Sequence, residues 1–238
     1  MQLQDAKTVR ELVTTNPAAA RVFEKFGIDY CCGGNKSLTE ACLEAKVRAE
    51  DVAAALEKPE SKPDERDWQK ESLAELADHI VSKHHAFTRE EIRRLEPLIL
   101  KVVSVHGQNH EELQKIEWLF QGLAQEMTMH MMKEEHMLFP YIKDLEEAAN
   151  HHLQLSPPMF GTVQNPVRMM MAEHDSSGQV LLKMREITNG YVTPNDACVS
   201  YQTLYRALEA FEKDMRRHIH LENNILFPRA VQLEAEAL

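Results

Sequence analysis

The sequence has no long uncharged apolar run and no excess of basic residues, and each shortage excludes a class of protein. A membrane-spanning helix needs a run of about 20 apolar residues, and the N-terminal stretch MQLQDAKTVR lacks the apolar core of a signal peptide. A formal net charge of −11 argues against nucleic acid and against an anionic membrane surface as partners. These absences predict a cytoplasmic protein.

Strand signals are also missing, because no stretch of useful length alternates apolar and polar residues. Only 8 glycines and 10 prolines interrupt 238 residues that are rich in alanine, leucine, glutamate and methionine. Those residues have high helix propensity, so the composition predicts an all-α protein. The chain holds only four cysteines. In a reducing compartment we expect any important thiol to be reactive, not part of a structural disulfide.

Residues 1–57 are predicted to form a small helical domain. Pro17 stands where a first helical position is expected, and Gly27 where a C-terminal cap is expected. Ser37-Leu-Thr-Glu40 has the form of a capping box, which marks a helix start. Short helices are therefore expected over 17–26, from Ser37 onward, and over 49–58.

A glycine-rich turn, DYCCGGN at 29–35, lies between the first two of these helices and carries Cys31 and Cys32. Backbone N–H groups and the following helix start lower a thiol pKa in such a turn, so both thiols are candidates for transfer chemistry. The alternative is that they pack as small apolar side chains, the role expected for Cys42 and Cys198. The charged stretch KPESKPDERD, 58–67, is predicted to be a linker.

The third predicted unit, residues 68–238, contains four long helical stretches with short connections. Such an arrangement is typical of an up-down-up-down four-helix bundle. Pro97, Pro140 and Pro228 fall inside these stretches, so kinks or helix ends are expected there. The four stretches run over 69–105, 110–148, 164–189 and 195–233.

Two segments of the bundle repeat each other at a distance of 88 residues. HMMKEEHMLFP begins at residue 130 and HIHLENNILFP at residue 218, so that His130 matches His218 and Glu134 matches Glu222. A His and a Glu at i and i+4 share one helix face, and here that face also carries apolar residues. A buried imidazole and carboxylate are unfavourable unless compensated. The same arrangement in two equivalent helices indicates a metal site.

The remaining two helices each offer an inward histidine. His174 shares a face with apolar residues of the third helix, and the first helix holds His84 and His85 in HIVSKHHAFTR. Helical periodicity alone does not decide between His84 and His85. The repeat favours His85, because it lies 45 residues before His130, close to the 44 residues between His174 and His218. His220, by contrast, is expected to be exposed.

The pattern therefore offers four imidazoles and two carboxylates, too many for one metal ion but suited to two ions bridged by both carboxylates. Such ligands suit iron and manganese and also zinc, and redox chemistry at a bridged pair favours iron. The alternative is that these are ordinary His-Glu contacts at the surface, which the repeat of the motif 88 residues later disfavours. The Glu-x-x-His pattern of ferritin-like sites and the His-Glu-x-x-His pattern of metalloproteases are not seen. The predicted ligands are His85, His130, Glu134, His174, His218 and Glu222.

These motifs resemble a known family. DYCCGG near residue 30, HMMKEE followed by LFP, AEHD, and HI-x-LENN-x-LFPRA together resemble the iron–sulfur cluster repair di-iron proteins (repair of iron centres), which place a haemerythrin-like bundle behind a small N-terminal domain. The resemblance covers essentially the whole chain. It implies a non-haem di-iron centre of two iron ions with the four histidines as terminal ligands and the two glutamates as bridges. His85, six residues after His79, agrees with the family pattern.

The resemblance also implies roles and partners. Glu173, beside a ligand histidine, and Glu126, one turn before another, would be second-sphere candidates, and Cys31 and Cys32 candidates for thiol transfer. The implied function is repair of clusters damaged by nitrosative or oxidative stress, with iron supplied from a labile site. The partners would be damaged iron–sulfur proteins or a cluster-assembly scaffold, together with nitric oxide or oxygen. A homodimer is one open assembly state.

Two other functions stay open from the sequence. The first is a nitric oxide reductase or scavenger at the di-iron site, which would make the protein an enzyme, whereas iron donation would not. The second is a sensor or carrier that binds oxygen or nitric oxide reversibly.

Overall fold

The computed structural model describes residues 7–16, 18–31, 33–57, 66–154, 156 and 158–237. Throughout these residues the regular structure is helical, and an isolated bridge between Thr8 and Ser37 is the β pairing that it contains. The predicted all-α class is therefore confirmed. Most of the predicted linker, 58–65, lies outside the described residues, as do Pro17 and Cys32.

The N-terminal unit contains four short helices, which are α1 (Val9–Thr15), α2 (Ala18–Phe26), α3 (Leu38–Glu44) and α4 (Ala49–Glu57). The capping box at Ser37 and Glu40 begins α3 as predicted. The sequence prediction missed α1, although Thr8 and Glu11 form a second capping box at its start. Buried side chains from all four helices form a separate hydrophobic cluster, so the unit has its own small core.

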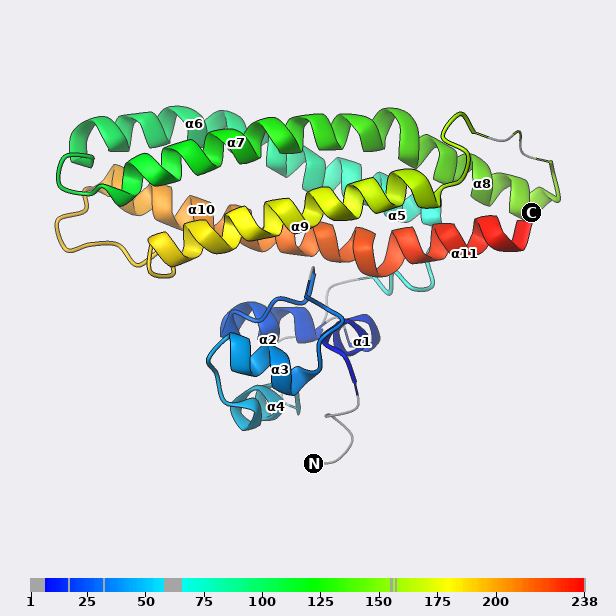
Figure 1. Cartoon of the computed structure of the whole chain (residues 1–238), viewed down its shortest axis with the longest axis horizontal. Helices are drawn as coiled ribbons and strands as arrows, with labels where there is room; N and C mark the ends of the chain where they lie inside the picture. The colour runs from blue at the N-terminus through cyan, green and yellow to red at the C-terminus, as the bar shows by residue number, and fades with distance from the viewer. Residues whose placement is uncertain are drawn as a thin grey trace.

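The bundle is made of four long rods, and turns of wider π-helix divide three of them. The first rod begins at a third capping box, Ser72 with Glu75, and the four rods lie side by side (Figure 1). In order, the rods are α5 (Leu73–His79), η1 (Ile80–His85) and α6 (Ala86–His106); α7 (Glu112–Lys133), η2 (Glu134–Leu138) and α8 (Phe139–His151); α9 (Gln164–Ile187); and α10 (Val199–Leu221), η3 (Glu222–Leu226) and α11 (Phe227–Ala237).

The three π-helical turns stand where the predicted metal ligands are. His85 ends η1, Glu134 begins η2 and Glu222 begins η3. The N–H groups of Phe139 and Phe227 donate to the carbonyls of Glu134 and Glu222, five residues back, which is the π-helical pattern. Single π-helical turns occur frequently at functional sites. The kinks expected at Pro140 and Pro228 thus take the form of a π-turn just before each proline.

A polar layer divides the bundle core into two hydrophobic clusters. One cluster includes Phe120 and Phe211 and fills the end where α6 meets α7 and α9 meets α10. The other includes Ile80, Phe139 and Phe227 and fills the opposite end. Between them lie buried histidines and glutamates, which an apolar core would normally exclude. The packing therefore places a layer of buried histidines and glutamates between two hydrophobic clusters.

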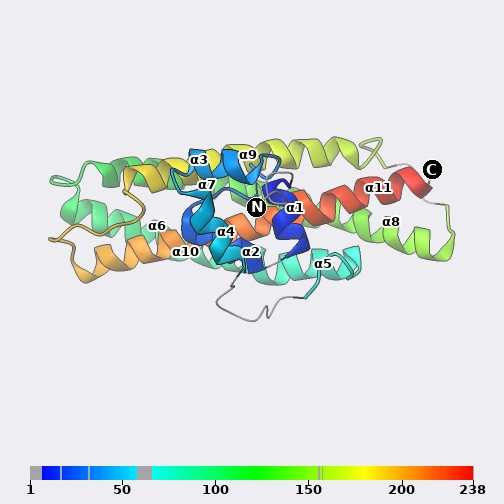
Figure 2. The ribbon, with the colours of Figure 1, turned by 90° about the horizontal axis from the view of Figure 1, so that it is seen from below.

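The N-terminal unit docks against the bundle beside α10 and η3 (Figure 1) and lies over its middle, not over an end (Figure 2). The Arg217 guanidinium donates two hydrogen bonds to the Glu24 carboxylate, at 2.7 and 2.6 Å. The Tyr30 hydroxyl donates to the same carboxylate, and the Asn224 amide donates to the Tyr30 carbonyl. A bidentate, charge-assisted pair of this kind fixes orientation as well as contact.

Candidate metal centre

The six predicted ligands converge in the polar layer and form two groups of four. His85 and His218 form one group with Glu134 and Glu222, and His130 and His174 form the other with the same two glutamates. In each group the candidate ligand atoms lie within 4.8 Å of one another. His85 was chosen over His84 from the repeat, and its Nε2 lies 3.1 Å from Nε2 of His218.

Each carboxylate divides its two oxygens between the groups. Glu134 Oε2 lies 3.4 Å from Nε2 of His85, while Glu134 Oε1 lies 3.2 Å from Nε2 of His130. Glu222 Oε1 lies 2.9 Å from Nε2 of His218, while Glu222 Oε2 lies 3.1 Å from Nε2 of His174. The arrangement is the one that two carboxylates adopt when both bridge a pair of metal ions.

The burial of these groups tests whether a metal fits. Glu134 and Glu222 are fully buried, and three of their four oxygens have no hydrogen-bond partner among the described residues. A buried carboxylate oxygen without a partner is strongly destabilising, by about 1–3 kcal/mol or more for a charged group. A divalent cation between the oxygens and the imidazoles removes that cost, so the donor set fits two metal ions.

The electrostatics of the metal-free site also indicate that it needs positive charge. Burial acts to lower the pKa of His85, but the nearby Glu134 and Glu222 carboxylates outweigh it and raise this pKa to about 9. Burial likewise acts on His130, where the charge of Glu134 prevails and raises the pKa to about 10. The imidazoles in turn hold the pKa of Glu222 well below its usual range, against burial. Protons on the imidazoles thus replace part of the positive charge that metal ions would supply.

Two of the predicted ligand imidazoles each donate a hydrogen bond to a carboxylate that also pairs with a cation. His130 Nδ1 donates to Oε2 of Glu173 at 2.8 Å, and the Lys133 ammonium pairs with the other oxygen of that carboxylate. His85 Nδ1 donates to Oε1 of Glu135 at 2.6 Å, and Arg89 donates to the same oxygen. Such partners fix the ring orientation and raise the basicity of a metal-binding imidazole.

The other two imidazoles differ from each other. His174 Nδ1 lies 2.8 Å from Oδ1 of Asn223 and donates to it. His218 Nδ1 has no hydrogen-bond partner among the residues that the structure describes. The His84 ring stacks on His218 with centroids 5.9 Å apart, and His84 Nδ1 pairs with Asp214 instead.

Sequence reasoning missed Glu135 and Asn223, although a signal for both was present. Each directly follows a bridging glutamate candidate, and the two lie 88 residues apart, the same distance as the rest of the repeat. Each reaches the Nδ1 atom of a histidine on a neighbouring rod. The repeat therefore includes the residue after each glutamate, with a change from carboxylate to amide.

The remaining candidates lie at different distances from the centre. Glu173 contacts His130, as described above, whereas Glu126 is exposed on α7 and lines a surface groove together with Glu173. Cys31 is buried, and its backbone N–H and Sγ both bond Oδ1 of Asp29, at 3.0 and 3.2 Å. Cys32 lies outside the described residues.

Comparison with known protein families gives two matches. Residues 5–60 match the ScdA_N domain, a domain of unknown function (DUF542), and residues 76–230 match the hemerythrin HHE cation binding domain. The second match covers the whole polar centre and more than half of the chain. The chain belongs to the family of proteins with a hemerythrin HHE cation-binding domain, here behind a ScdA_N domain.

Several relatives share the description iron-sulfur cluster repair protein YtfE. The chain is 34% identical over 221 residues to the iron-sulfur cluster repair protein YtfE of Escherichia coli O157:H7, and this covers 93% of the chain and 94% of the relative. The proteins with the same description in Citrobacter koseri and Shigella boydii serotype 4 match at the same identity and coverage. The family that the motifs resembled is therefore confirmed. Among the described residues no helix is long and apolar enough to cross a bilayer.

Proposed function

We propose that the protein repairs iron–sulfur clusters damaged by nitrosative or oxidative stress, and that it supplies iron from a labile di-iron site. The observation that carries the proposal is the sharing of Glu134 and Glu222 between two imidazole pairs. The description of the relatives as iron-sulfur cluster repair proteins supports the same function. His85, His130, His174 and His218 would be terminal ligands, and the two glutamates would be bridges.

The ligand chemistry favours iron as cargo. Imidazoles and carboxylates bind ferrous iron, which is low in the affinity order of divalent metals for such ligands. A site without thiolates therefore releases ferrous iron more readily than a cysteine site, which is the site type of most iron–sulfur clusters. Transfer from this bundle to a cluster protein or to a cluster-assembly scaffold would thus run from the weaker site to the stronger one.

The N-terminal unit places a buried cysteine against the bundle. Cys31 packs with bundle core residues, and the Arg216 guanidinium of α10 lies 3.6 Å from the Asp29 carboxylate that Cys31 contacts. Burial acts to lower the pKa of Arg216, but the nearby charges of Cys31, Glu212 and Asp29 raise it. A thiol beside a permanent cation is suited to transfer chemistry, and we propose this role for Cys31 and Cys32.

Reactivation of a damaged cluster enzyme tests the proposal. Anaerobic, iron-loaded protein should restore activity to a [4Fe–4S] enzyme that nitric oxide has inactivated, and iron should appear in the enzyme as it leaves the donor. Glu222→Ala should abolish both, while Glu147→Ala on the exposed face of α8 should leave both unchanged. Reactivation that proceeds equally well with Glu222→Ala would rule out iron supply from this centre.

Reduction of nitric oxide is a second candidate, and one observation favours it. Glu173 is partly exposed, lines a surface groove and contacts the buried His130, so it joins solvent to the centre by a carboxylate that exchanges protons. Two ferrous ions held side by side would supply two electrons to a small ligand. Many turnovers of nitric oxide with an electron donor, lowered by Glu173→Gln, would support reduction, whereas strictly stoichiometric consumption would contradict it.

A further inference from the structure

The Ser177 hydroxyl lies in the bundle core beside the metal centre, and it has no hydrogen-bond partner among the described residues. Ser177 is fully buried, and it follows the ligand candidate His174 by three residues on the face of α9 that also carries Leu181. Serine is mostly found at the surface, and a buried hydroxyl without a partner is costly. Ser177 therefore places an unused donor about one helical turn from the polar layer.

The first rod carries a second buried hydroxyl at the equivalent position. Thr88 follows His85 by three residues, as Ser177 follows His174, and it is also fully buried. The Thr88 hydroxyl donates to the sulfur of Met215 at 3.6 Å. A thioether sulfur is a weak acceptor, but it leaves Thr88 engaged, whereas Ser177 finds no hydrogen-bond partner in the part of the chain that the structure describes.

The two hydroxyls lie on one side of the polar layer and tilt toward it. The first and third rods run in the same direction, from the hydrophobic cluster with Ile80 to the cluster with Phe120, and the layer lies between these clusters (Figure 1). Thr88 and Ser177 follow their ligand histidines, so they stand on the side of the layer that faces Phe120, here called the Phe120 side. Helical side chains tilt toward the N-terminus of their helix, and on these two rods that direction leads back to the ligand histidines.

The opposite side of the layer is already filled. The Phe139 ring stacks on His85 with centroids 5.8 Å apart, and the Phe227 ring stacks on His174 with centroids 6.0 Å apart. Both shared carboxylates come from this side as well, because each follows its histidine on a rod that runs toward the cluster with these phenylalanines. Rings and carboxylates thus leave the Phe120 side for a further ligand of the metals.

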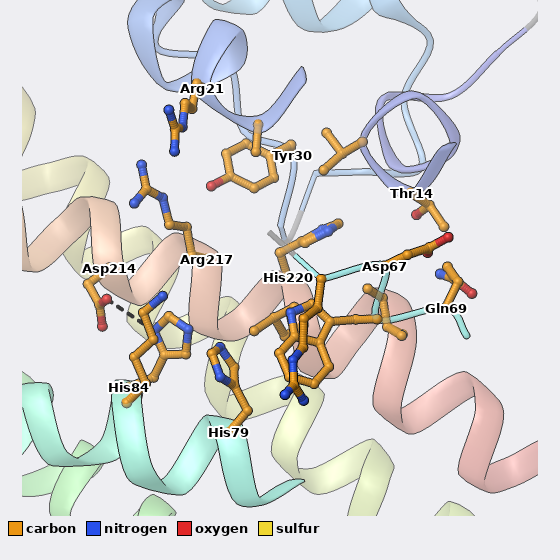
Figure 3. A pocket seen from close by; sticks show the side chains of 17 residues that line it. Thr14, Arg21, Tyr30, Asp67, Gln69, His79, His84, Asp214, Arg217 and His220 are labelled. Atoms are coloured by element: carbon orange, nitrogen blue, oxygen red, sulfur yellow. Dashed lines mark hydrogen bonds and ion pairs between the residues drawn. The ribbon is translucent and has the colours of Figure 1, made fainter. Parts of the chain in front are cut away.

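An imidazole separates the layer from the interface with the N-terminal unit. A cavity lies at this interface, and Figure 3 shows His84 and Asp214 at its edge, joined by their 3.0 Å ion pair. The His84 ring stacks on His218 with centroids 5.9 Å apart. His84 therefore stands between the cavity and the layer, and its Nδ1 is already engaged.

The other two rods add flexible, uncharged side chains on the Phe120 side. Three residues before His130 and His218 stand Met127 and Met215, both fully buried. Together with the two hydroxyls they make a set of two thioethers and two alcohols around the layer. Methionine side chains adapt to irregular spaces. Such surroundings suit a small ligand, and the unpartnered hydroxyl needs an acceptor atom.

We propose that a small exogenous ligand of the metal pair binds on the Phe120 side of the polar layer and accepts a hydrogen bond from the Ser177 hydroxyl. The ligand class is a molecule or ion of two or three atoms with an acceptor atom at its free end. Ser177 is the donor because the Thr88 hydroxyl already bonds Met215. The inference rests on the proposed di-iron centre, but it does not depend on whether that centre supplies iron or reduces nitric oxide.

Azide binding to full-length, iron-loaded protein tests the proposal, because azide has three atoms and an acceptor nitrogen at its end. Visible absorbance measures the affinity in the oxidised state. Ser177→Ala should weaken azide binding about three- to tenfold, the range expected for one hydrogen bond. Ser177→Thr, which keeps a hydroxyl as at position 88, should restore most of the affinity. Ser176→Ala, exposed on the same helix, is the matched control and should bind azide as the wild type does.

Infrared spectra give a readout that a structural role of the hydroxyl would not change. In the wild type the azide stretching band should shift between water and deuterium oxide, because the hydroxyl proton that bonds the azide exchanges. Ser177→Ala should lose most of this shift, and Ser176→Ala should keep it.

The metal-free protein provides a second test that needs no iron. Both Ser177→Ala and Ser176→Ala gain helix propensity, but the first also removes a buried hydroxyl without a partner. We therefore expect Ser177→Ala to raise the Tm of metal-free protein more than Ser176→Ala does. A lower Tm of Ser177→Ala than of the wild type would show that the hydroxyl already has a partner inside the protein, and would overturn the proposal.

Unchanged azide affinity and an unchanged isotope shift in Ser177→Ala would also overturn it. Iron content, measured alongside, separates this result from a failure of the centre itself. A variant that holds as much iron as the wild type and binds azide equally well contradicts the role of Ser177 alone, whereas a wild-type protein without stoichiometric iron contradicts the proposed di-iron centre.

Discussion

The two halves of the polar centre share their carboxylates but hold their imidazoles differently. In one half, His130 and His174 each have an Nδ1 partner, Glu173 and Asn223. In the other half, His85 has Glu135, whereas His218 Nδ1 has no hydrogen-bond partner among the described residues. Loss of such a partner lowers metal affinity about 10–100-fold. We therefore expect the ion held by His85 and His218 to leave first.

The cause of the difference is a single position. Glu173 directly precedes His174 in α9 and supports His130 on the neighbouring rod. The corresponding residue before His85 is His84, whose ring stacks on His218 but whose Nδ1 pairs with Asp214. The half with His130 thus has the Glu173 carboxylate as an Nδ1 partner. The half with His218 has the His84 ring at the equivalent position, and this ring stacks on His218 without a hydrogen bond to its Nδ1. The proposed supply of iron requires only one half to be loosely held.

Removal of a shared carboxylate should have the largest effect. Glu222→Ala takes one oxygen from each ligand group, so we expect iron content to fall from two ions per chain to less than one. Metal analysis of protein purified without oxygen measures this, with Glu147→Ala on the exposed face of α8 as control. Retention of two ions by Glu222→Ala would show that the carboxylate is no bridge.

A change that weakens the firmly held half should remove the difference between the halves. Wild-type protein should lose iron to a strong chelator in two phases, and Asn223→Ala should accelerate the slow phase about 10–100-fold because His174 loses its Nδ1 partner. Asn150→Ala, exposed on α8, should keep both wild-type rates. Acceleration of the fast phase instead would show that His130 and His174 hold the ion that is released first.

A milder change in the same half should have a smaller effect. Glu173→Gln keeps an acceptor for His130 Nδ1 but removes its charge, so we expect metal affinity to fall by no more than about tenfold. In the metal-free protein the pKa of His130, raised to about 10, should fall toward its usual value. Metal titration and NMR of the His130 ring measure the two effects, and Glu186→Gln on the exposed face of α9 is the control. An unchanged pKa of His130 would show that Glu173 does not stabilise the protonated imidazole.

The smallest expected effect is a pH dependence of metal-free stability. In the folded protein the pKa values of His85 and His130 are raised to about 9 and about 10. The stability that they contribute is therefore fully present below their unfolded pKa of about 6.5 and is lost as pH rises through the folded values. Urea unfolding of metal-free protein should show this alkaline loss. Metal loading should release protons and suppress the loss, and an alkaline loss of equal size with metal bound would contradict the assignment.

The helices and the histidines that converge in the polar layer were predictable, because each has a local or repeated signal. The four rods follow from helical periodicity, and the 88-residue repeat identified His130 and His218 with their glutamates. The π-turns η2 and η3 were not predicted, because the prolines after them indicate a break but not its form. They depend on tertiary packing around the polar layer, which no local pattern encodes.

Two further predictions, for Cys198 and His220, were wrong because tertiary contacts decide whether these side chains are buried. Cys198 was expected to pack in the core, but it is exposed just before α10, with Sγ 3.2 Å from Nε2 of His106. His220 was expected to be exposed, but docking of the N-terminal unit covers it, and its ring packs against Tyr30. Both depend on which distant segment covers the residue, and spacing within one helix does not contain that information.

Iron content and Mössbauer spectra of the protein purified without oxygen test the central claim most directly. We expect two iron ions per chain with two distinct signals, because the imidazoles of the two halves are supported differently. A protein that contains no stoichiometric iron, or that becomes more stable when Glu134 and Glu222 are replaced by apolar residues without loss of bound metal, would contradict it.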